Sequence, residues 1–168
     1  TVKFNGNYYK IYDEIMTWTE AKIQCEELGG RLVTITSQSE MDFLIRQLAN
    51  AQKNCYWIGM KYWGNEGRWQ LVTGTSTPYF NWAQDEPNSL GKNDQDYVYL
   101  YGKPYVYQII TREVGEWANV GNDSVAFTGS FNSLENFGYI CEWGDESVAE
   151  ADDLVEREGH YYQLYCHA

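Results

Sequence analysis

Two segments near the start of the chain have the apolar periodicity of amphipathic helices. In the first, apolar residues recur at i, i+3, i+7 and i+10, on one face of a helix: Trp18, Ala21, Cys25 and Leu28. Thr17 and Glu20 form a T-x-x-E capping box ahead of them, and Gly29–Gly30 accept the left-handed conformation that ends helices. The pattern predicts a helix between these two signals.

The second segment repeats this signature. Ser37 and Glu40 form another capping box, and apolar residues follow at i, i+3, i+4 and i+7. They are Met41, Leu44, Ile45 and Leu48. Between the two predicted helices, residues 31–36 contain β-branched side chains and partly alternate apolar with polar, which favours a short strand or an extended connector.

After Asn50 the helical periodicity gives way to short aromatic and β-branched runs, which are typical of strands. We expect strands at Tyr56–Met60, Trp69–Val72, Tyr97–Tyr101 and Tyr105–Ile110, a short segment from Trp117, and a closing strand at Phe137–Trp143. Residues 73–92 are rich in Gly, Ser, Thr, Asn and Pro and are expected to form a long loop. Two helices followed by many short strands predict an α+β fold.

Composition narrows the class of partner. The 168 residues suit one domain, and its 7 Trp, 15 Tyr and 6 Phe offer stiff surfaces that stack on sugar rings or fill a core. A formal net charge of −12 argues against nucleic acid and against anionic membranes, both of which need cationic patches. The acidity fits carboxylates gathered around calcium, or a charge that keeps an extracellular protein soluble.

The cysteines favour disulfides over a metal site. The chain has four, at Cys25, Cys55, Cys141 and Cys166, and no C-x-x-C pair. This spacing excludes the usual zinc patterns and leaves two disulfides or free buried thiols. The two histidines both lie in the tail without a metal-ligand pattern.

Several of these segments together resemble the C-type lectin-like family, in the order that the family has them. They are Trp18–Lys22 with Cys25, Leu28–Leu32, Ile35–Ser37, Tyr56–Gly59 and Gly138–Glu142. The resemblance covers about residues 4–144 and indicates a divergent or bacterial-like member. It implies a double-looped α+β fold of two helices and small antiparallel sheets, with a long ligand-binding loop. It also implies a Cys25–Cys141 disulfide between the first helix and the last strand.

The chain departs from the family at its second disulfide. The family's inner cysteines would fall near Tyr97 and Asn122, which are not cysteines. Cys55 and Cys166 are therefore left to pair with each other or to remain free. The segments from Tyr97 to Cys141 are also longer than is usual, which indicates a remodelled binding face.

The resemblance sets a domain boundary near residue 144. We expect residues 1–144 to form the lectin-like domain and residues 145–168 to form an acidic linker or tail. Within that tail, Gly159–Tyr165 matches Gly6–Tyr12 in register, either because a second, similar domain begins there or because a strand happens to use tyrosines.

The Glu86-Pro87-Asn88 tripeptide is the centre of the expected binding site. In the family this sequence supplies calcium ligands, the bond before proline is cis, and sugar hydroxyls complete the shell of the ion. Calcium prefers six to eight oxygen ligands, and the Glu86 carboxylate and the Asn88 carbonyl oxygen are of this kind. The Glu-Pro-Asn order resembles members that take mannose-, glucose- or fucose-type sugars.

The remaining ligands expected from the resemblance are less complete. The family's third acidic ligand falls at Asp94, with Asp96 as the next choice. Its Trp-Asn-Asp sequence becomes Trp117-Ala118-Asn119, which lacks one donor oxygen and replaces a carboxylate by an amide. Asp123 replaces the lost ligand if the loop that follows Asn119 folds back toward the site. A site with fewer anionic ligands binds calcium more weakly, or has lost it.

Aromatic residues near these positions have two interpretations. Tyr97, Tyr99, Tyr101 and Trp117 either flank the ligand, where a ring stacks under a sugar, or alternate between core and surface. Three other tryptophans are assigned to the core: Trp57, Trp69 and Trp143. Asn122-Asp123-Ser124 is a glycosylation sequon.

The sequence therefore predicts an extracellular, calcium-dependent lectin domain whose partners are glycans or glycoproteins, without nucleic acid or membrane insertion, and with tandem domains in a larger protein as an open alternative. A calcium-independent module for protein binding or adhesion is the competing hypothesis. An enzyme is not expected, because the chain before His160 contains no histidine for a catalytic set. Its loops contain many acidic residues, and the sequence identifies no pair of carboxylates among them that would hydrolyse a glycoside.

Overall fold

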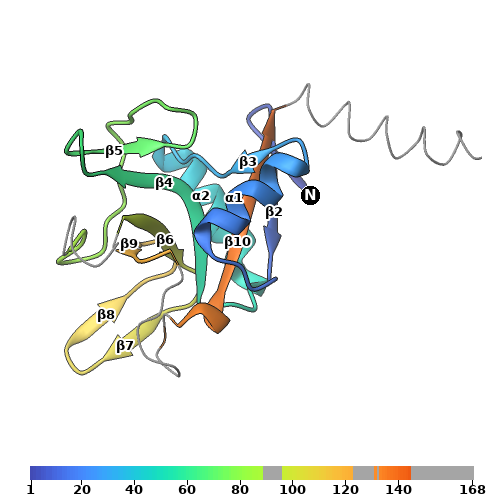
Figure 1. Ribbon diagram of the computed structural model, residues 1–168. Coiled ribbons are helices and arrows are strands. Elements are labelled where there is room, and N and C mark those ends of the chain that lie inside the picture. The colour runs from blue at the N-terminus through green and yellow to red at the C-terminus, as the bar shows by residue number, and fades with distance from the viewer. Residues whose placement is uncertain (89–95, 123–130, 132, 145–168) are drawn as a thin grey trace, which may run out of the picture.

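The computed structural model describes residues 1–88, 96–122, 131 and 133–144, and it confirms the α+β class (Figure 1). The helices are α1 (Trp18–Glu27) and α2 (Gln38–Gln47), with short 3-10 segments η1 (Leu48–Asn50) and η2 (Leu134–Asn136). The strands are β1 (Val2–Phe4), β2 (Asn7–Tyr12), β3 (Arg31–Leu32), β4 (Cys55–Trp63), β5 (Arg68–Leu71), β6 (Tyr97–Tyr101), β7 (Tyr105–Tyr107), β8 (Ile110–Arg112), β9 (Trp117–Val120) and β10 (Phe137–Gly144).

One twisted sheet connects the two ends of the described chain. Its strand order is β1-β2-β10-β4-β6-β9, with β3 also paired to β10 and β5 to β4. The β10–β4 pair is parallel, whereas β2 and β6 pair with their neighbours in antiparallel fashion. The early strand β2 therefore lies beside the final strand β10, while β6 and β9 lie at the far side of β4 (Figure 1).

The capping signals set both helix starts, although only one box is complete. In α1 the Glu20 amide donates to Thr17 Oγ1 and the Thr17 amide donates to Glu20 Oε2. In α2 the Glu40 amide donates to Ser37 Oγ, but the Glu40 carboxylate accepts from the Thr36 amide instead. The second predicted capping box is therefore only half formed. The reason is tertiary, because Tyr9 also donates to the buried Glu40 carboxylate at 2.8 Å.

Two apolar clusters cover the two faces of the sheet. One contains residues of α2 with the sheet residues Ile58, Val98 and Trp117. The other contains Trp18 of α1 with Trp57 and the Cys25–Cys141 disulfide, which confirms the pairing that the family resemblance implied. Burial of large apolar and aromatic side chains on both faces is the main stabilising term of such a layered domain.

Cys55 is a free, fully buried thiol in the structure. The alternative, a disulfide with Cys166, stays a prediction because Cys166 lies outside the described residues. The core assignments of Trp57 and Trp143 are confirmed, whereas Trp69 is only half-buried.

Residues 31–36 contain a short strand, β3 at Arg31–Leu32, which confirms the prediction for this segment. Two other local predictions need correction. The strand predicted over residues 105–110 is a hairpin, because the chain turns at Gln108–Ile109, where Gln108 takes a positive φ of 54°. Leu28, placed by periodicity on the buried face of α1, is exposed because the helix ends at Glu27 and Leu28 is its C-cap.

Candidate functional site

The loop that carries Glu86-Pro87-Asn88 is held against the edge strand β9. The Trp117 amide donates to the Asn81 carbonyl oxygen at 2.8 Å, and the Ala83 amide donates to the Trp117 carbonyl oxygen at 2.9 Å. Trp82 and Trp117 form a parallel bridge between the loop and the strand. These backbone contacts fix the start of the loop, and the Glu86–Pro87 bond is cis, as the family resemblance implied.

A pair of asparagines fixes the other end of the tripeptide. The backbone amide of Asn88 donates to Asn119 Oδ1 at 2.9 Å, and Asn119 Nδ2 donates back to the Asn88 carbonyl oxygen at 2.7 Å. Asn119 is buried in β9, so its side chain has few rotamers available. We call this two-bond contact the asparagine clasp, and it positions the Asn88 side chain beside Glu86.

Glu86 is a half-satisfied carboxylate. Its Oε1 accepts a hydrogen bond of 2.8 Å from Asn88 Nδ2, whereas Oε2 is buried and has no hydrogen-bond partner among the described residues. Burial raises the pKa of Glu86 to about 7, against the opposing effects of the Arg112 charge and of hydrogen bonding to Asn119 and Asn88. A carboxylate in this state gains from a cation that replaces its lost hydration.

Asp96 presents a second buried oxygen at the same end of the sheet. It directly precedes β6, whose Val98 pairs with Asn119 of β9. Its carbonyl oxygen accepts from the Tyr62 amide at 2.7 Å, which anchors the backbone, while its Oδ1 is buried and has no hydrogen-bond partner among the described residues. The structure thus brings together three of the predicted site residues, Glu86, Asn88 and Asn119, through direct hydrogen bonds. Asp96 lies just before the strand that pairs with the Asn119 strand.

These residues fit calcium in part. The two orphaned carboxylate oxygens of Glu86 and Asp96 are the hard donors that the ion prefers. Asn119 does not fit, because both polar atoms of its amide are engaged in the asparagine clasp, and the buried Ala118 offers no side-chain donor. In the part of the chain that the structure describes, no three His, Cys, Asp or Glu side chains form a metal-binding group. Asp94 and Asp123 lie outside the described residues.

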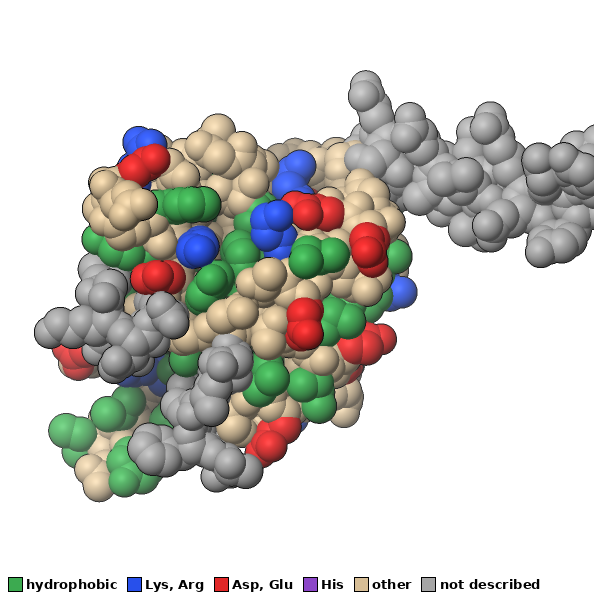
Figure 2. All heavy atoms as spheres, viewed as in Figure 1, with side chains coloured by type: hydrophobic (Ala, Val, Ile, Leu, Met, Phe, Trp, Pro, Cys, Tyr) green, Lys and Arg blue, Asp and Glu red, His purple; other side chains and the backbone are tan. Residues whose placement is uncertain are grey.

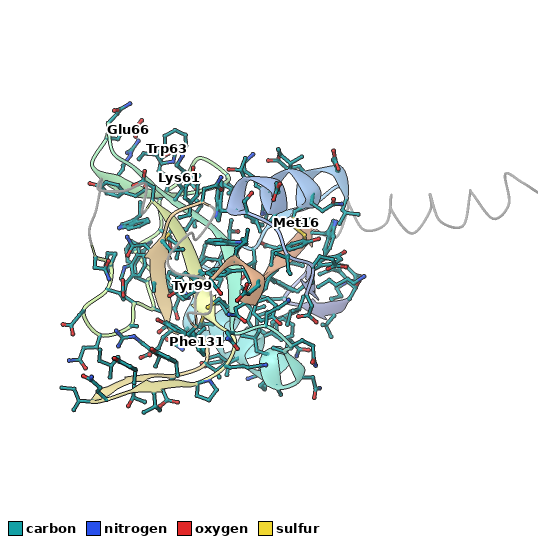
Figure 3. The ribbon with its side chains drawn as sticks, turned by 60° about the horizontal axis from the view of Figure 1, so that its bottom comes forward. Met16, Lys61, Trp63, Glu66, Tyr99 and Phe131 are labelled. Atoms are coloured by element: carbon teal, nitrogen blue, oxygen red, sulfur yellow. A yellow bond between two sulfur atoms is a disulfide. The ribbon has the colours of Figure 1, made fainter. Side chains whose placement is uncertain are left out.

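The aromatic candidates divide between core and surface. Trp117, Tyr99 and Tyr101 are buried. They therefore belong to the core and cannot stack under a sugar. Tyr97 is half-buried, and its ring lies 4.9 Å from that of Trp18. It is also covered by Lys61 Nζ, 4.7 Å from the ring centroid. Lys61 lies on β4, on the same strand as the exposed Trp63 (Figure 3).

Sequence reasoning missed two features of this region. The first is an aromatic stack next to the loop, where Trp82 lies 4.9 Å from Trp69 and 6.0 Å from the exposed ring of Phe80. The Phe80-Asn81-Trp82 run directly before the tripeptide was a signal that could have found it. The second is the buried Arg112, whose charge acts on Glu86. No periodicity identifies that residue, because the hairpin alone brings it there.

A model of the lectin C-type domain matches residues 14–126. The chain belongs to the C-type lectin domain family. It is 34% identical over 93 residues to hepatic lectin of Gallus gallus, covering 54% of this chain and 44% of that protein. It is 37% identical over 95 residues to CD209 antigen of Pongo pygmaeus, covering 54% of this chain and 23% of that protein. The aligned region is therefore less than half of either relative.

Solved structures confirm the C-type lectin fold. The C-type carbohydrate-recognition domain of cow CD23, solved in the presence of a GlcNAc2Man3 oligosaccharide, superposes with a TM-score of 0.63 at 26% identity. That match covers 85% of this chain and 92% of the CD23 chain. A calcium-independent type II antifreeze protein superposes with a TM-score of 0.62 at 19% identity, covering 85% and 90% of the two chains.

Membership of this family confirms that the C-type lectin domain is not an enzyme. None of the helices in the described residues is long and apolar enough to cross a membrane.

Proposed function

We propose that this C-type lectin domain is an extracellular carbohydrate-binding module that recognises mannose-, glucose- or fucose-type sugars through calcium at the Glu86-Pro87-Asn88 loop. The observation that carries the proposal is the state of Glu86. Its carboxylate is preorganised by Asn88, buried at one oxygen, and left without a partner there. A buried carboxylate without a partner is costly in a purely structural role, and calcium offsets that cost.

The described chain contributes three groups to this function. Glu86, Asn88 and Asp96 would hold the ion, with Asp94 and Asp123 as further ligands from outside the described residues. Bound calcium supplies coordination positions for two vicinal sugar hydroxyls. The asparagine clasp orients the Asn88 side chain, whose amide nitrogen can donate to a sugar hydroxyl while Glu86 accepts from another. Relatives that are named as lectins and mannose receptors support the sugar class.

The test compares melting temperatures in excess calcium and in chelator for the native chain, Glu86→Gln and Glu113→Gln. Glu113 is an exposed acid after β8, so its variant removes the same charge from the surface. A ligand at about 100 times its Kd adds roughly 2.7 kcal/mol of stability, which is several degrees in Tm for a domain of this size. We expect calcium to raise the Tm of the native chain and Glu113→Gln, but not that of Glu86→Gln. Calcium-dependent retention on immobilised mannose should follow the same order.

An equal Tm in calcium and chelator for the native chain would reject the calcium site. In that case the competing hypothesis applies, in which the domain binds protein without calcium. The engaged amide of Asn119 and the missing donor at Ala118 favour that alternative, since both reduce the number of ligands for the ion. Retention on mannose in chelator would instead show a lectin that does not need the ion.

A further inference from the structure

The hairpin β7–β8 is the most apolar exposed part of the described chain. Four of its side chains are open to solvent: Ile109 (97% exposed), Val106 (68%), Tyr107 (56%) and Ile110 (42%). The hairpin projects from the body of the domain in Figure 1, and Figure 2 shows hydrophobic side chains gathered at its end. Residues 104–111 contain no charge, although the chain has 12 basic and 24 acidic residues. An exposed apolar patch of this kind marks a contact surface.

A continuous row of packed aromatic rings, which we call the ladder, connects this hairpin to the core. Centroid distances are 5.3 Å from Tyr99 to Tyr101, 5.9 Å from Tyr101 to Phe131 and 4.4 Å from Phe131 to Tyr105. The nearly parallel rings of Tyr105 and Tyr107 follow at 6.5 Å. In Figure 3, Phe131 lies between Tyr99 and the hairpin. The ladder runs from a buried tyrosine to an exposed one, so the hairpin is supported by packed rings at its base.

The base of the hairpin is connected to the Glu86 loop. After β8 the Gly115 amide donates to the Tyr101 carbonyl oxygen at 2.8 Å, and the Gly115 carbonyl oxygen accepts from Asn81 Nδ2 at 2.8 Å. Asn81 belongs to the same loop as Glu86, and the buried Arg112 at the end of β8 lowers the pKa of Glu86. The hairpin therefore projects from beside the proposed sugar site.

We propose that the β7–β8 hairpin binds an uncharged, extended segment of polypeptide that lies next to the glycan held by the Glu86 loop. The preferred ligand is then a glycoprotein with apolar residues around its glycosylated position. The glycan half of this statement rests on the proposed function, whereas the peptide half rests on the hairpin alone.

Three features of the domain favour an uncharged, extended polypeptide segment as the ligand of the hairpin. β7 and β8 form a sheet of two strands in the described chain, so their outer edges offer backbone groups to an added strand. Strands of three residues present far less than the roughly 800 Å² per partner of a stable protein–protein interface, so a second copy of the chain would be held weakly. The net charge of −12 repels acidic partners and anionic bilayers. An uncharged segment is not repelled, and it matches the uncharged surface of the hairpin at residues 104–111.

The test uses two synthetic glycopeptides with the same oligomannose glycan on asparagine, flanked in one by Val, Ile and Tyr and in the other by Asp and Lys. The apolar peptide without glycan and free mannose complete the set of probes. Ile109→Ser and Val106→Ser change exposed hairpin side chains and leave the core intact. Ile15→Ser is the matched control, since Ile15 is 53% exposed and lies outside the hairpin, just ahead of α1.

We expect the native chain to bind the apolar glycopeptide about tenfold more tightly than the charged one, which is about 1.4 kcal/mol. Ile109→Ser and Val106→Ser should reduce this preference to about twofold or less, whereas Ile15→Ser should retain it. Affinity for free mannose should be the same in all four proteins.

Equal affinity of the native chain for both glycopeptides would overturn the proposal, as would a similar loss in Ile15→Ser. So would a dimer in analytical ultracentrifugation, or binding to phosphatidylcholine vesicles, if Ile109→Ser abolished it, because a second copy or a bilayer would then cover the hairpin. Failure of the sugar site has a different signature. Mannose and the glycan then contribute nothing, while the peptide without glycan still binds and still depends on Ile109.

Discussion

Two carboxylates, the buried Glu142 and the half-buried Glu86, have opposite environments. Glu142 lies on β10 and is almost fully buried. Its Oε1 accepts from Asn7 Nδ2 at 2.8 Å and Arg31 NH2 at 3.0 Å, and its Oε2 accepts from both the amide and the hydroxyl of Thr34 at 2.9 Å. Glu86 accepts a hydrogen bond from Asn88 Nδ2 at Oε1, whereas its Oε2 is buried and has no hydrogen-bond partner in the described chain.

The difference separates a structural carboxylate from one with an oxygen left available for the proposed ligand site. Four donors, one of them the Arg31 cation, satisfy Glu142, so it joins the N-terminal strands to the last strand and has little capacity left for a ligand. Glu86 is only partly compensated for its loss of hydration, and burial raises its pKa to about 7. Carboxylates with such perturbed pKa values in a preorganised loop are typical of binding sites.

The largest expected effect is at Glu142. Glu142→Ala removes the acceptor of four hydrogen bonds and leaves the buried Thr34 amide and the Arg31 charge without compensation. We expect a loss of about 3–5 kcal/mol in the free energy of unfolding, measured by urea denaturation. The control Glu135→Ala changes an exposed acid and should cost less than about 0.5 kcal/mol. Similar losses in the two variants would remove the distinction between structural and functional carboxylates.

A smaller effect of opposite sign is expected at Glu86 in chelator. The folded-state pKa of about 7 lies above the ordinary value of 4.5, so the folded protein keeps this proton longer than the unfolded chain as the pH rises. The native chain should therefore lose stability between about pH 4.5 and pH 7, relative to Glu86→Gln, and no more above that range. After allowance for solvent screening of the partly exposed side chain, the variant should be about 1–2 kcal/mol more stable at pH 8. Equal stabilities at pH 4 and pH 8 would show that Glu86 is not perturbed.

The pH dependence of calcium affinity is a further test of the difference between Glu86 and Glu142. Calcium binds the carboxylate form of Glu86, and the pKa of about 7 means that a proton competes with the ion near neutral pH. We expect the calcium Kd, measured by isothermal titration calorimetry, to rise about tenfold from pH 8 to pH 6. Glu86→Gln should bind calcium weakly and with no such pH dependence. A native Kd that is constant over this range would place the ion elsewhere.

The local pattern of the sequence was sufficient for most elements of the fold. The capping residues Thr17 and Ser37 set both helix starts, and the aromatic runs located β4, β6 and β10. Helix periodicity and N-caps act over a few residues, so they can be identified without knowledge of the tertiary structure. The turn at Gln108–Ile109 was not identified, because the positive φ of Gln108 falls on a residue that carries no turn signal.

The sequence also pointed to the centre of the proposed site, through the Glu86-Pro87-Asn88 tripeptide. It did not identify what Asn119 does. By analogy with the family it was expected to bind the ion, but the structure uses both ends of its amide to hold Asn88. Only the pairing of β9 with β6 and the approach of the Glu86 loop determine that contact.

The sequence by itself determined most elements of this protein, its family resemblance and the loop that carries the proposed ligand site. The tertiary structure alone decided which carboxylate is satisfied, since the donors to Glu142 come from residues more than a hundred positions away. It also decided that the hairpin stands beside Glu86, through the contacts of Gly115 with Tyr101 and Asn81. Burial and hydrogen bonding between distant segments exist only once the chain has folded, so the electrostatic state of a carboxylate is a property of the tertiary structure.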